Sequence, residues 1–138
     1  MLKKGDLTFV NDSKATNAEA AKKALECFDD IYWIVGGVDK SDGIDSLVPL
    51  MNKVKKAYLI GRAQDRFAKT LESAGGNFSK CSTMENAMLE IKKEAKEGIV
   101  LLSPSCASFD QFKDFEARGD SFKKLVAVSY THLPSPRD

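Results

Sequence analysis

The sequence is poor in the residues that build zinc sites, disulfide frameworks and histidine-dependent hydrolases. It has three cysteines, none of them in a CxxC pair, and a single histidine, His132, close to the carboxyl end. An odd number of unpaired cysteines argues against both a disulfide framework and a zinc site. A Ser-His-Asp or Cys-His hydrolase needs a histidine packed beside its nucleophile, so that class is disfavoured as well. We expect no metal ligand and no catalytic residue in this chain.

Long apolar runs and an excess of one charge are also missing. No run approaches the ~20 apolar residues that cross a membrane. The 21 Lys and Arg against 20 Asp and Glu leave a net charge of +1, too little for a basic stripe that holds nucleic acid. We therefore expect a cytoplasmic protein that binds neither membrane nor nucleic acid, while a local cationic pocket for a small anion stays open.

What is present suits one compact domain of mixed α/β type. The chain has 138 residues, of which 43% are hydrophobic and 30% charged, values typical of a folded domain with a real core. Apolar runs of strand length predict strands. They lie at Leu7–Val10, Ile31–Val35, Lys56–Ile60 and Ile99–Leu102, with a weaker candidate at Asn77–Cys81.

Segments with helical spacing separate these runs. Thr16 with Glu19, and Ser82 with Glu85, fit the capping box that satisfies free amides at a helix start. Asp45 is a candidate cap for a further short helix. The apolar stripes of the three clearer helices are Ala18, Ala21, Leu25 and Phe28; Phe67, Leu71 and Ala74; and Met84, Ala87, Met88, Ile91 and Ala95.

A last helix is predicted near the carboxyl end. Ser108 and Gln111 fit another capping box, which places the helix start at residue 108. Asp114 and Arg118 are spaced for an ion pair one turn apart, and Gly119 either breaks this helix or allows close packing. The apolar side of the helix is formed by Phe112, Phe115, Phe122 and Val126.

Strands that alternate with helices of about ten residues predict crossover connections and a mainly parallel sheet. The fold class we expect is therefore a doubly wound, Rossmann-like α/β domain with helices on both faces of the sheet. In such sheets ligands bind beyond the carboxyl ends of the strands. The loops to examine are residues 11–17, 36–43 and 103–108, which are polar and follow three of the predicted strands.

Two of these loops carry a lysine, Lys14 and Lys40. Their ammonium groups could recognise carboxylates or phosphates together with nearby hydroxyls and helix-start amides. A single lysine of this kind is more often a solvated surface cation, whereas the two together, at consecutive strand ends, fit either reading equally well. Gly36-Gly37 indicates a tight turn. It belongs to neither a GxGxxG fingerprint nor a GxxxxGK[ST] loop, so the chain has no phosphate-cradling motif of its own.

Taken together, the loops resemble the carboxyl-terminal domain of the Mur ligases, and most closely that of the members that add D-glutamate. The similarity runs from about Leu7 to Val126, and the DNPR-like block of ligases that add diaminopimelate or lysine is not found. The matching blocks are NDSKATN at Asn11–Asn17, Gly36-Gly37 with Lys40, and LSPSCASFDQFKDFEARG at Leu102–Gly119.

The end of the chain departs from this resemblance. Residues 127–138 break the helical pattern and contain Pro134 and Pro136, which cannot continue a helix. We therefore predict a Mur ligase carboxyl-terminal domain over residues 1–126, followed by a non-native or disordered tail over residues 127–138.

The resemblance implies a reaction. In this family ATP phosphorylates the carboxylate of UDP-N-acetylmuramoyl-L-alanine, the amine of D-glutamate attacks the acyl phosphate, and Mg²⁺ ions hold the phosphates. An N-terminal and a central domain supply the UDP site, the P-loop and the metal ligands, none of which this chain contains. The isolated chain is therefore expected to be inactive and to bind no cofactor alone.

The same resemblance implies which residues contact the substrates. Asp12 and Lys14 would approach the ribose and phosphates of ATP. Charge and hydroxyls suit a substrate with two carboxylates, because they fix it and leave its amine free to attack. The residues expected around D-glutamate are Thr16, Lys40, Ser108, the backbone of Phe109 and the ring of Phe115.

Two other readings stay open from the sequence. A flavodoxin-like binding or regulatory module would use the same edge of the sheet without chemistry of its own. A related amide ligase of the folylpolyglutamate synthase type would share the architecture, but the block Ser108–Gly119 argues against it.

Overall fold

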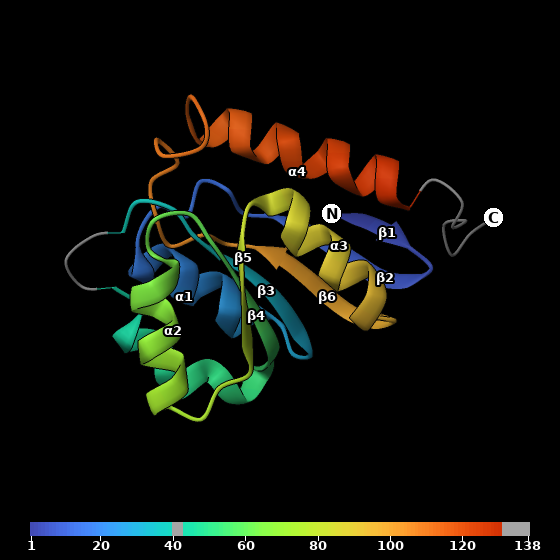
Figure 1. Ribbon diagram of the computed structural model, residues 1–138. Helices are drawn as coiled ribbons and strands as arrows, with labels where there is room; N and C mark the ends of the chain where they lie inside the picture. The colour runs from blue at the N-terminus through green and yellow to red at the C-terminus, as the bar shows by residue number, and fades with distance from the viewer. Residues whose placement is uncertain (40–42, 131–138) are drawn as a thin grey trace.

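The structure, a computed structural model, describes residues 1–39 and 43–130 (Figure 1). Among these residues, six strands form one sheet in the order β1-β2-β6-β3-β4-β5. All neighbouring strands are parallel except β1 and β2, which are antiparallel. The strands are β1 (Leu2–Lys4), β2 (Asp6–Asn11), β3 (Ile31–Gly36), β4 (Val54–Ile60), β5 (Phe78–Ser82) and β6 (Glu97–Leu102).

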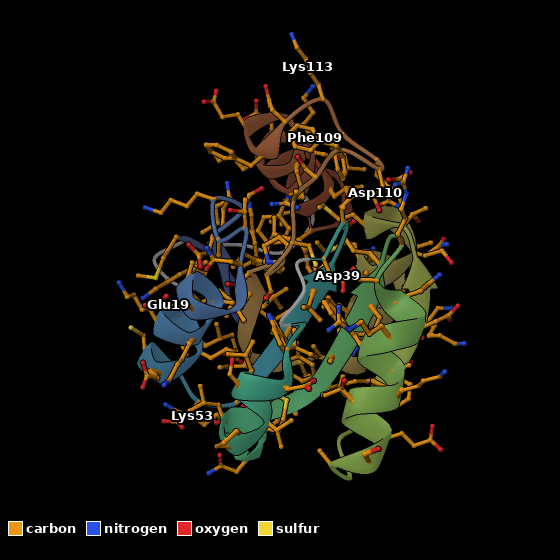
Figure 2. All side chains as sticks on the ribbon, turned by 90° about the vertical axis from the view of Figure 1, so that its left-hand side faces the viewer. Glu19, Asp39, Lys53, Phe109, Asp110 and Lys113 are labelled. Atoms are coloured by element: carbon orange, nitrogen blue, oxygen red, sulfur yellow. The ribbon has the colours of Figure 1, made fainter. Side chains whose placement is uncertain are left out.

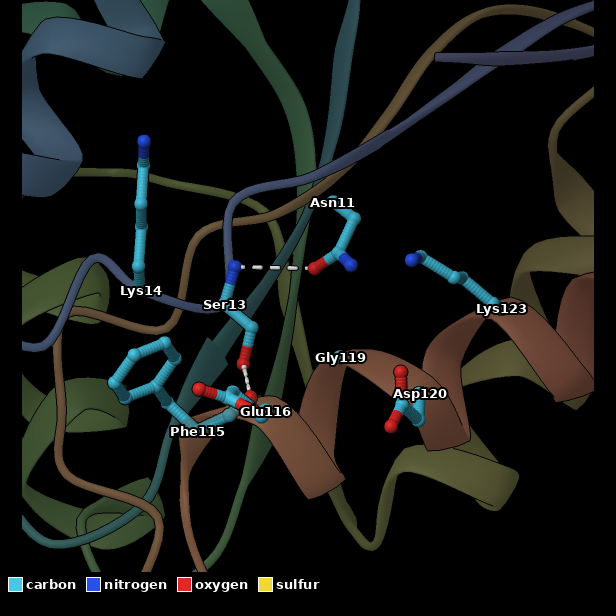
Figure 3. A pocket seen from close by; sticks show the side chains of 8 residues that line it. All are labelled: Asn11, Ser13, Lys14, Phe115, Glu116, Gly119, Asp120 and Lys123. Atoms are coloured by element: carbon cyan, nitrogen blue, oxygen red, sulfur yellow. Dashed lines mark hydrogen bonds between the residues drawn. The ribbon is translucent and has the colours of Figure 1, made fainter.

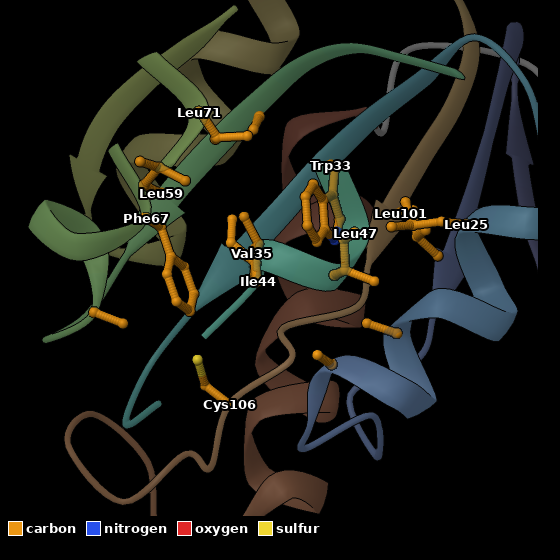
Figure 4. Packing of buried hydrophobic residues seen from close by; sticks show 14 of the residues in the cluster. Leu25, Trp33, Val35, Ile44, Leu47, Leu59, Phe67, Leu71, Leu101 and Cys106 are labelled. Atoms are coloured by element: carbon orange, nitrogen blue, oxygen red, sulfur yellow. The ribbon is translucent and has the colours of Figure 1, made fainter. Parts of the chain in front are cut away.

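The helices cover both faces of this sheet. The helices α1, η1 and α2 pack on one face, where Figure 4 shows Trp33 and Val35 of β3 among their apolar side chains. The helices α3 and α4 pack on the other face, against Phe9 and Ile34. Their bounds are α1 (Ala18–Cys27), the 3₁₀ helix η1 (Asp45–Lys53), α2 (Gln64–Ser73), α3 (Met84–Glu94) and α4 (Phe115–Ser129). The predicted doubly wound, mainly parallel α/β fold is confirmed.

Two details of the predicted strands and helices needed correction. Strand β1 was missed, because it is a three-residue edge strand whose lysines give no apolar signal; it turns into β2 at Gly5, which has a φ of 60°. The capping boxes were placed one residue too early. Asn17 accepts from the backbone N of Ala20 at 2.8 Å, and Thr83 accepts from the backbone N of Asn86 at 3.2 Å.

The start of α4 was also predicted wrongly. The helix begins at Phe115, and the carboxylate of Asp114 caps it by accepting from the backbone N of Ala117 at 2.8 Å. Ser108 instead opens a turn, where its carbonyl accepts from the backbone N of Phe112 at 2.8 Å. Because Asp114 serves as the cap and Arg118 turns inward, the expected ion pair between them is absent from the ion pairs of the described residues.

The end of α4 is packed further than expected. The helix continues to Ser129, and the ring of the buried Tyr130 lies with its centroid 4.9 Å from that of Phe9. The expectation of a disordered segment after Val126 is therefore wrong for residues 127–130, because Tyr130 follows Val126 by one helical turn and extends the same buried stripe. The remainder of the predicted tail lies outside the described residues.

No helix within residues 1–39 and 43–130 is both long and apolar enough to cross a bilayer.

Candidate functional site

The described parts of the three loops that the sequence singled out meet at one edge of the sheet. Parallel strands β2, β6 and β3 are neighbours, with Asn11 and Ile34 both in register with Leu102, so their carboxyl ends lie together. Backbone hydrogen bonds join the loops that follow. The N–H of Ser105 donates to the carbonyl of Ala15 at 2.9 Å. The predicted common edge is confirmed, and the loops form one connected surface.

A hollow of about 340 Å³ opens between the loops of residues 11–17 and 103–108 and the start of α4. Ser108, which lines it, is buried with 3% of its surface exposed, whereas Phe109 is 74% exposed and Phe115 is 43% exposed. The hollow is lined by Thr16, Ala107, Ser108, Phe109, Asp114 and Phe115. The structure thus brings together four of the five residues expected around D-glutamate, and the fifth, Lys40, lies outside the described residues. Their contact with a substrate stays a prediction.

The loop that carries Phe109 is held across the sheet by its next two residues. The carboxylate of Asp110 accepts from the backbone N of Arg62 at 2.9 Å, after β4. The side chain of Gln111 donates to the carbonyl of Ser82 at 2.6 Å, at the end of β5. Figure 2 shows Phe109 and Asp110 on this loop, above the sheet. Neither anchor is predicted from the sequence, because Gln111 also fits a helix cap, which the structure does not form.

Asp12 and Lys14, expected to face the nucleotide, stand side by side on the loop after β2. The hydroxyl of Ser103 donates to the Asp12 carboxylate at 2.9 Å. Burial raises the pKa of Asp12, while that hydrogen bond and the charge of Lys14 oppose the rise. Both residues line a hollow of about 420 Å³, and Lys23 also lines it.

A further hollow, of about 260 Å³, lies where this loop meets the start of α4 (Figure 3). Its wall contains Asn11, Ser13 and Lys14 from the loop, and Gly119 and Lys123 from the helix. A Cβ atom built on Gly119 would lie 2.9 Å from the side-chain nitrogen of Asn11. Gly119 therefore stays within the helix and permits close packing, one of the two roles expected for it.

The buried guanidinium of Arg118 forms hydrogen bonds to two of these loops. The side chain is 1% exposed, and it donates to the hydroxyl of Ser13 at 2.9 Å, the carbonyl of Ser13 at 2.5 Å and the carbonyl of Cys106 at 2.9 Å. Burial lowers the pKa of Arg118 to about 10, which leaves the group charged at neutral pH. The sequence did contain a signal, since Arg118 is in phase with the core residues Phe122 and Val126.

Within the part of the chain that the structure describes, no three His, Cys, Asp or Glu side chains gather in a group that could hold a metal ion. We therefore assign no metal ligand among these residues.

Sequence comparisons find proteins that are similar to this chain. The family model described as "Mur ligase, glutamate ligase domain" matches residues 1–106. The UDP-N-acetylmuramoylalanine–D-glutamate ligase of Agrobacterium fabrum is 53% identical over 132 residues, which cover 91% of this chain and 28% of the relative. That of Rhizobium meliloti is 52% identical over 131 residues, with 91% and 28% covered. The chain thus spans between a quarter and a third of these curated relatives.

Solved structures resemble the fold at low sequence identity. A murein peptide ligase from Psychrobacter arcticus matches with a TM-score of 0.63 and 11% identity, over 98% of this chain and 30% of that one. A domain assigned to a UDP-N-acetylmuramate:L-alanyl-γ-D-glutamyl-meso-diaminopimelate ligase from Haemophilus ducreyi matches with a TM-score of 0.57 and 10% identity, over 90% and 95%. At these identities the likeness concerns the fold.

Proposed function

The chain belongs to the Mur ligase family, by its glutamate ligase domain, and from this membership we propose that it is the carboxyl-terminal, substrate-closing domain of a cytoplasmic ATP-dependent ligase. The whole enzyme would add D-glutamate to UDP-N-acetylmuramoyl-L-alanine in the synthesis of peptidoglycan precursors. Because the chain spans 28% of relatives with that name, an N-terminal and a central domain would supply the UDP site and the P-loop.

The observation that carries this proposal is the hollow that Thr16, Ser108, Phe109 and Phe115 share. D-glutamate has two carboxylates and one amine. We propose that the Thr16 and Ser108 hydroxyls and the backbone N–H of Phe109 donate to the carboxylates, that Lys40 neutralises one of them, and that the Phe115 ring closes one side. This set offers donors to the carboxylates and leaves the amine free.

The nucleotide would lie beside this hollow. Asp12 and Lys14 share a second hollow with the cation of Lys23. A carboxylate suits the hydroxyls of a ribose as their acceptor, and ammonium groups suit phosphate oxygens. When bound, ATP supplies the phosphoryl group that activates the acceptor carboxylate. The described residues form no group that could hold a metal ion, so in this proposal the Mg²⁺ ions would be held by the other domains.

In this proposal the chain positions the substrates and transfers no proton. The D-glutamate hollow and the nucleotide-facing loop share one sheet edge, so closure of the domain would carry the amine toward the activated carboxylate. Holding two reactants in line for attack lowers the barrier by removing their freedom to move apart.

The proposal can be tested in a chimera. The matched segment of the Agrobacterium fabrum ligase would be replaced by residues 1–130 of this chain, and phosphate release would be measured with and without each substrate. We expect release to require both D-glutamate and UDP-N-acetylmuramoyl-L-alanine, with a product mass that shows the new amide.

Two outcomes would contradict the proposal. Turnover with L-glutamate and a folate acceptor in place of these substrates would identify a folylpolyglutamate synthase type of ligase. A folded chimera without substrate-dependent turnover, together with a chain whose NMR spectrum does not respond to D-glutamate at the Thr16 and Ser108 amides, would favour a binding module of another kind.

A further inference from the structure

The buried guanidinium of Arg118 touches both loops of the proposed site without facing either hollow. We propose that Arg118 is a positioning residue that fixes the loop of residues 11–17 against the loop of residues 103–108, so that the D-glutamate hollow and the nucleotide-facing segment form one site. This inference rests on the proposed function and deepens it, because it assigns the residue that holds the two substrate subsites together.

The first support is the distribution of its hydrogen bonds. Two of its donors bind Ser13, through the hydroxyl at 2.9 Å and the carbonyl at 2.5 Å, and the third binds the carbonyl of Cys106 at 2.9 Å. Ser13 stands between Asp12 and Lys14, and Cys106 lies two residues before Ser108. One side chain thus fixes the backbone on both sides of the proposed site.

A second link passes through Ser13 to the start of α4. While its oxygen accepts from Arg118, the Ser13 hydroxyl donates to the carbonyl of Phe115 at 2.6 Å (Figure 3). The ring of Phe115 lines the proposed D-glutamate hollow. The network therefore connects the nucleotide-facing loop, the loop of Ser108 and the Phe115 ring.

The charge of Arg118 is the third support. A buried cation is costly unless it is paired or fully hydrogen-bonded, and no ion pair among the described residues involves Arg118. Its hydrogen-bond partners are neutral oxygens, and the charge of the nearby Asp110 favours the charged form of Arg118 without an ion pair between the two side chains. A core residue required for packing alone would be apolar, so the retained charge and fork indicate a role in the site.

The experiment compares four variants in the chimera described above and in the 138-residue chain. Arg118→Lys keeps the charge but loses the planar fork, and Arg118→Met loses both. Phe122→Leu, one turn along the same helix and buried in the core against Phe9 of β2, is the control for lost packing, because a phenylalanine side chain donates no hydrogen bond to either loop. Ser13→Ala removes only the hydroxyl, and it keeps the test possible if an Arg118 variant does not fold.

In the chimera, Arg118→Met should raise KM for both D-glutamate and ATP by about tenfold or more, the size of one lost charge-assisted hydrogen bond. Arg118→Lys should not restore either KM fully, and Ser13→Ala should raise both by a smaller factor. Phe122→Leu should leave both within about twofold. Equal KM values for Arg118→Met and Phe122→Leu would overturn the inference.

Hydrogen exchange in the isolated chain tests the inference without depending on catalysis. The amides of Ala15, Ser105 and Ala107 are hydrogen-bonded within or between the loops, so their hydrogen exchange reports on loop order. Arg118→Lys should speed all three by about tenfold relative to Phe122→Leu. Unchanged exchange would overturn the inference even if the chimera adds D-glutamate, whereas an inactive wild-type chimera with faster exchange in Arg118→Lys would contradict the proposed function alone.

Discussion

The three thiols of this chain differ in burial, and this difference sets their reactivity. Cys27 is exposed, whereas Cys81 and Cys106 are buried. Burial raises the pKa of each buried thiol to about 12, and for Cys81 a hydrogen bond to the carboxylate of Glu90 adds to the rise. The thiolate is the reactive form, so the two buried residues should be unreactive at neutral pH.

We predict that iodoacetamide at pH 8 labels the folded chain once, at Cys27, and labels Cys81 and Cys106 only after unfolding. Mass spectrometry of the intact protein and its peptides measures this directly. Cys27→Ser is the control, and it should take up no label while folded. Rapid labelling of either buried thiol would show that the sheet edge or α3 opens more readily than the packing indicates.

The carboxylate of Glu94, the last residue of α3, should make stability depend on pH. The pKa of Glu94 is lowered from its ordinary value of 4.5, chiefly because Lys56 donates two hydrogen bonds to the carboxylate, at 2.7 and 3.0 Å. Tyr58 donates a third, at 3.0 Å. A carboxyl group whose pKa is lower in the folded state stabilises the protein above the unfolded value near 4.5, and this stabilisation is lost as the pH falls through the folded value.

Lys56→Met should therefore reduce the free energy of unfolding at pH 7 and make less difference as the pH falls below 4.5. We expect less than about 1 kcal/mol at pH 7, because the Glu94 side chain is 40% exposed and solvent screens the pair. Urea titrations at several pH values measure the difference. Lys80→Met, which removes a more exposed pair with Asp65, should change less. A difference that stays constant with pH would contradict this account.

At the scale of elements, the buried strands could be predicted and the helix starts could be predicted only approximately. Strands covered on both faces read as continuous apolar runs, so β2, β3, β4 and β6 were found near their observed bounds. Capping patterns are short and recur. Both Ser108 and Asp114 satisfy the local requirement for a cap, and the bonds of Asp110 and Gln111 to distant strand ends decide in favour of Asp114.

The candidate site too could be predicted from the sequence only in part. Periodicity predicted which loops meet, because parallel strands end at one edge. The residues expected to contact the substrates were named from the resemblance to the Mur ligases, since a serine or phenylalanine in a loop carries no physical mark of its role, and these contacts stay predictions. Arg118 was missed because a local ion pair with Asp114 explained its spacing, while its actual partners, Ser13 and Cys106, are set by tertiary packing.

The end of β3 depends on a glycine. Gly36 has a φ of 139°, and a Cβ atom built there would lie 1.9 Å from the backbone oxygen of Ile60 on β4. Backbone in a sheet cannot move aside without breaking the pairing of the two strands. We predict that Gly36→Ala lowers the free energy of unfolding by roughly 3 kcal/mol or more, from overpacking and from an unfavourable φ.

Gly75→Ala is the matched control for Gly36→Ala. Gly75 also has a positive φ, of 74°, but a Cβ atom built there meets no other atom within 4 Å. Its substitution should cost only the conformational penalty of about 1–2 kcal/mol. Urea titration of both variants separates the two contributions, and equal losses would show that the strands yield at Gly36.

At the scale of the whole molecule, the proposed site is one-sided. Its hollows lie at the carboxyl edge of the sheet and open outward from this chain, with Phe109 74% exposed beside one of them. In the proposed closed ligase, a substrate would be enclosed from the other side by the proposed N-terminal and central domains. The binding energy of each substrate would then be shared between domains.

Lys40 offers a test of which substrate this edge binds. In the chimera, Lys40→Ala should raise KM for D-glutamate by roughly 10- to 100-fold, because an ammonium–carboxylate hydrogen bond in a closed site contributes about 1.5–3 kcal/mol. KM for ATP should change far less. Ser108→Ala should act in the same direction and less strongly, since a hydroxyl carries no net charge. A rise confined to KM for ATP would move Lys40 to the nucleotide site.

The last prediction concerns the chain alone. The described residues contain no group that could hold a metal ion, and the sequence has no GxxxxGK[ST] loop to hold the phosphates of ATP. The isolated chain should therefore neither hydrolyse ATP nor form the amide. It should bind D-glutamate only weakly, with a Kd of about 1 mM or above, because an open half-site leaves both carboxylates partly hydrated.

Phosphate release by the purified chain measures ATP turnover, and NMR titration with D-glutamate measures its binding, with L-glutamate as the matched control ligand. Shifts for D-glutamate should centre on Thr16, Ser108 and Phe115 and should saturate at lower concentration than those for L-glutamate. Sustained ATP turnover by the chain would show that it holds a nucleotide centre of its own, and the division of the reaction between domains would then be wrong.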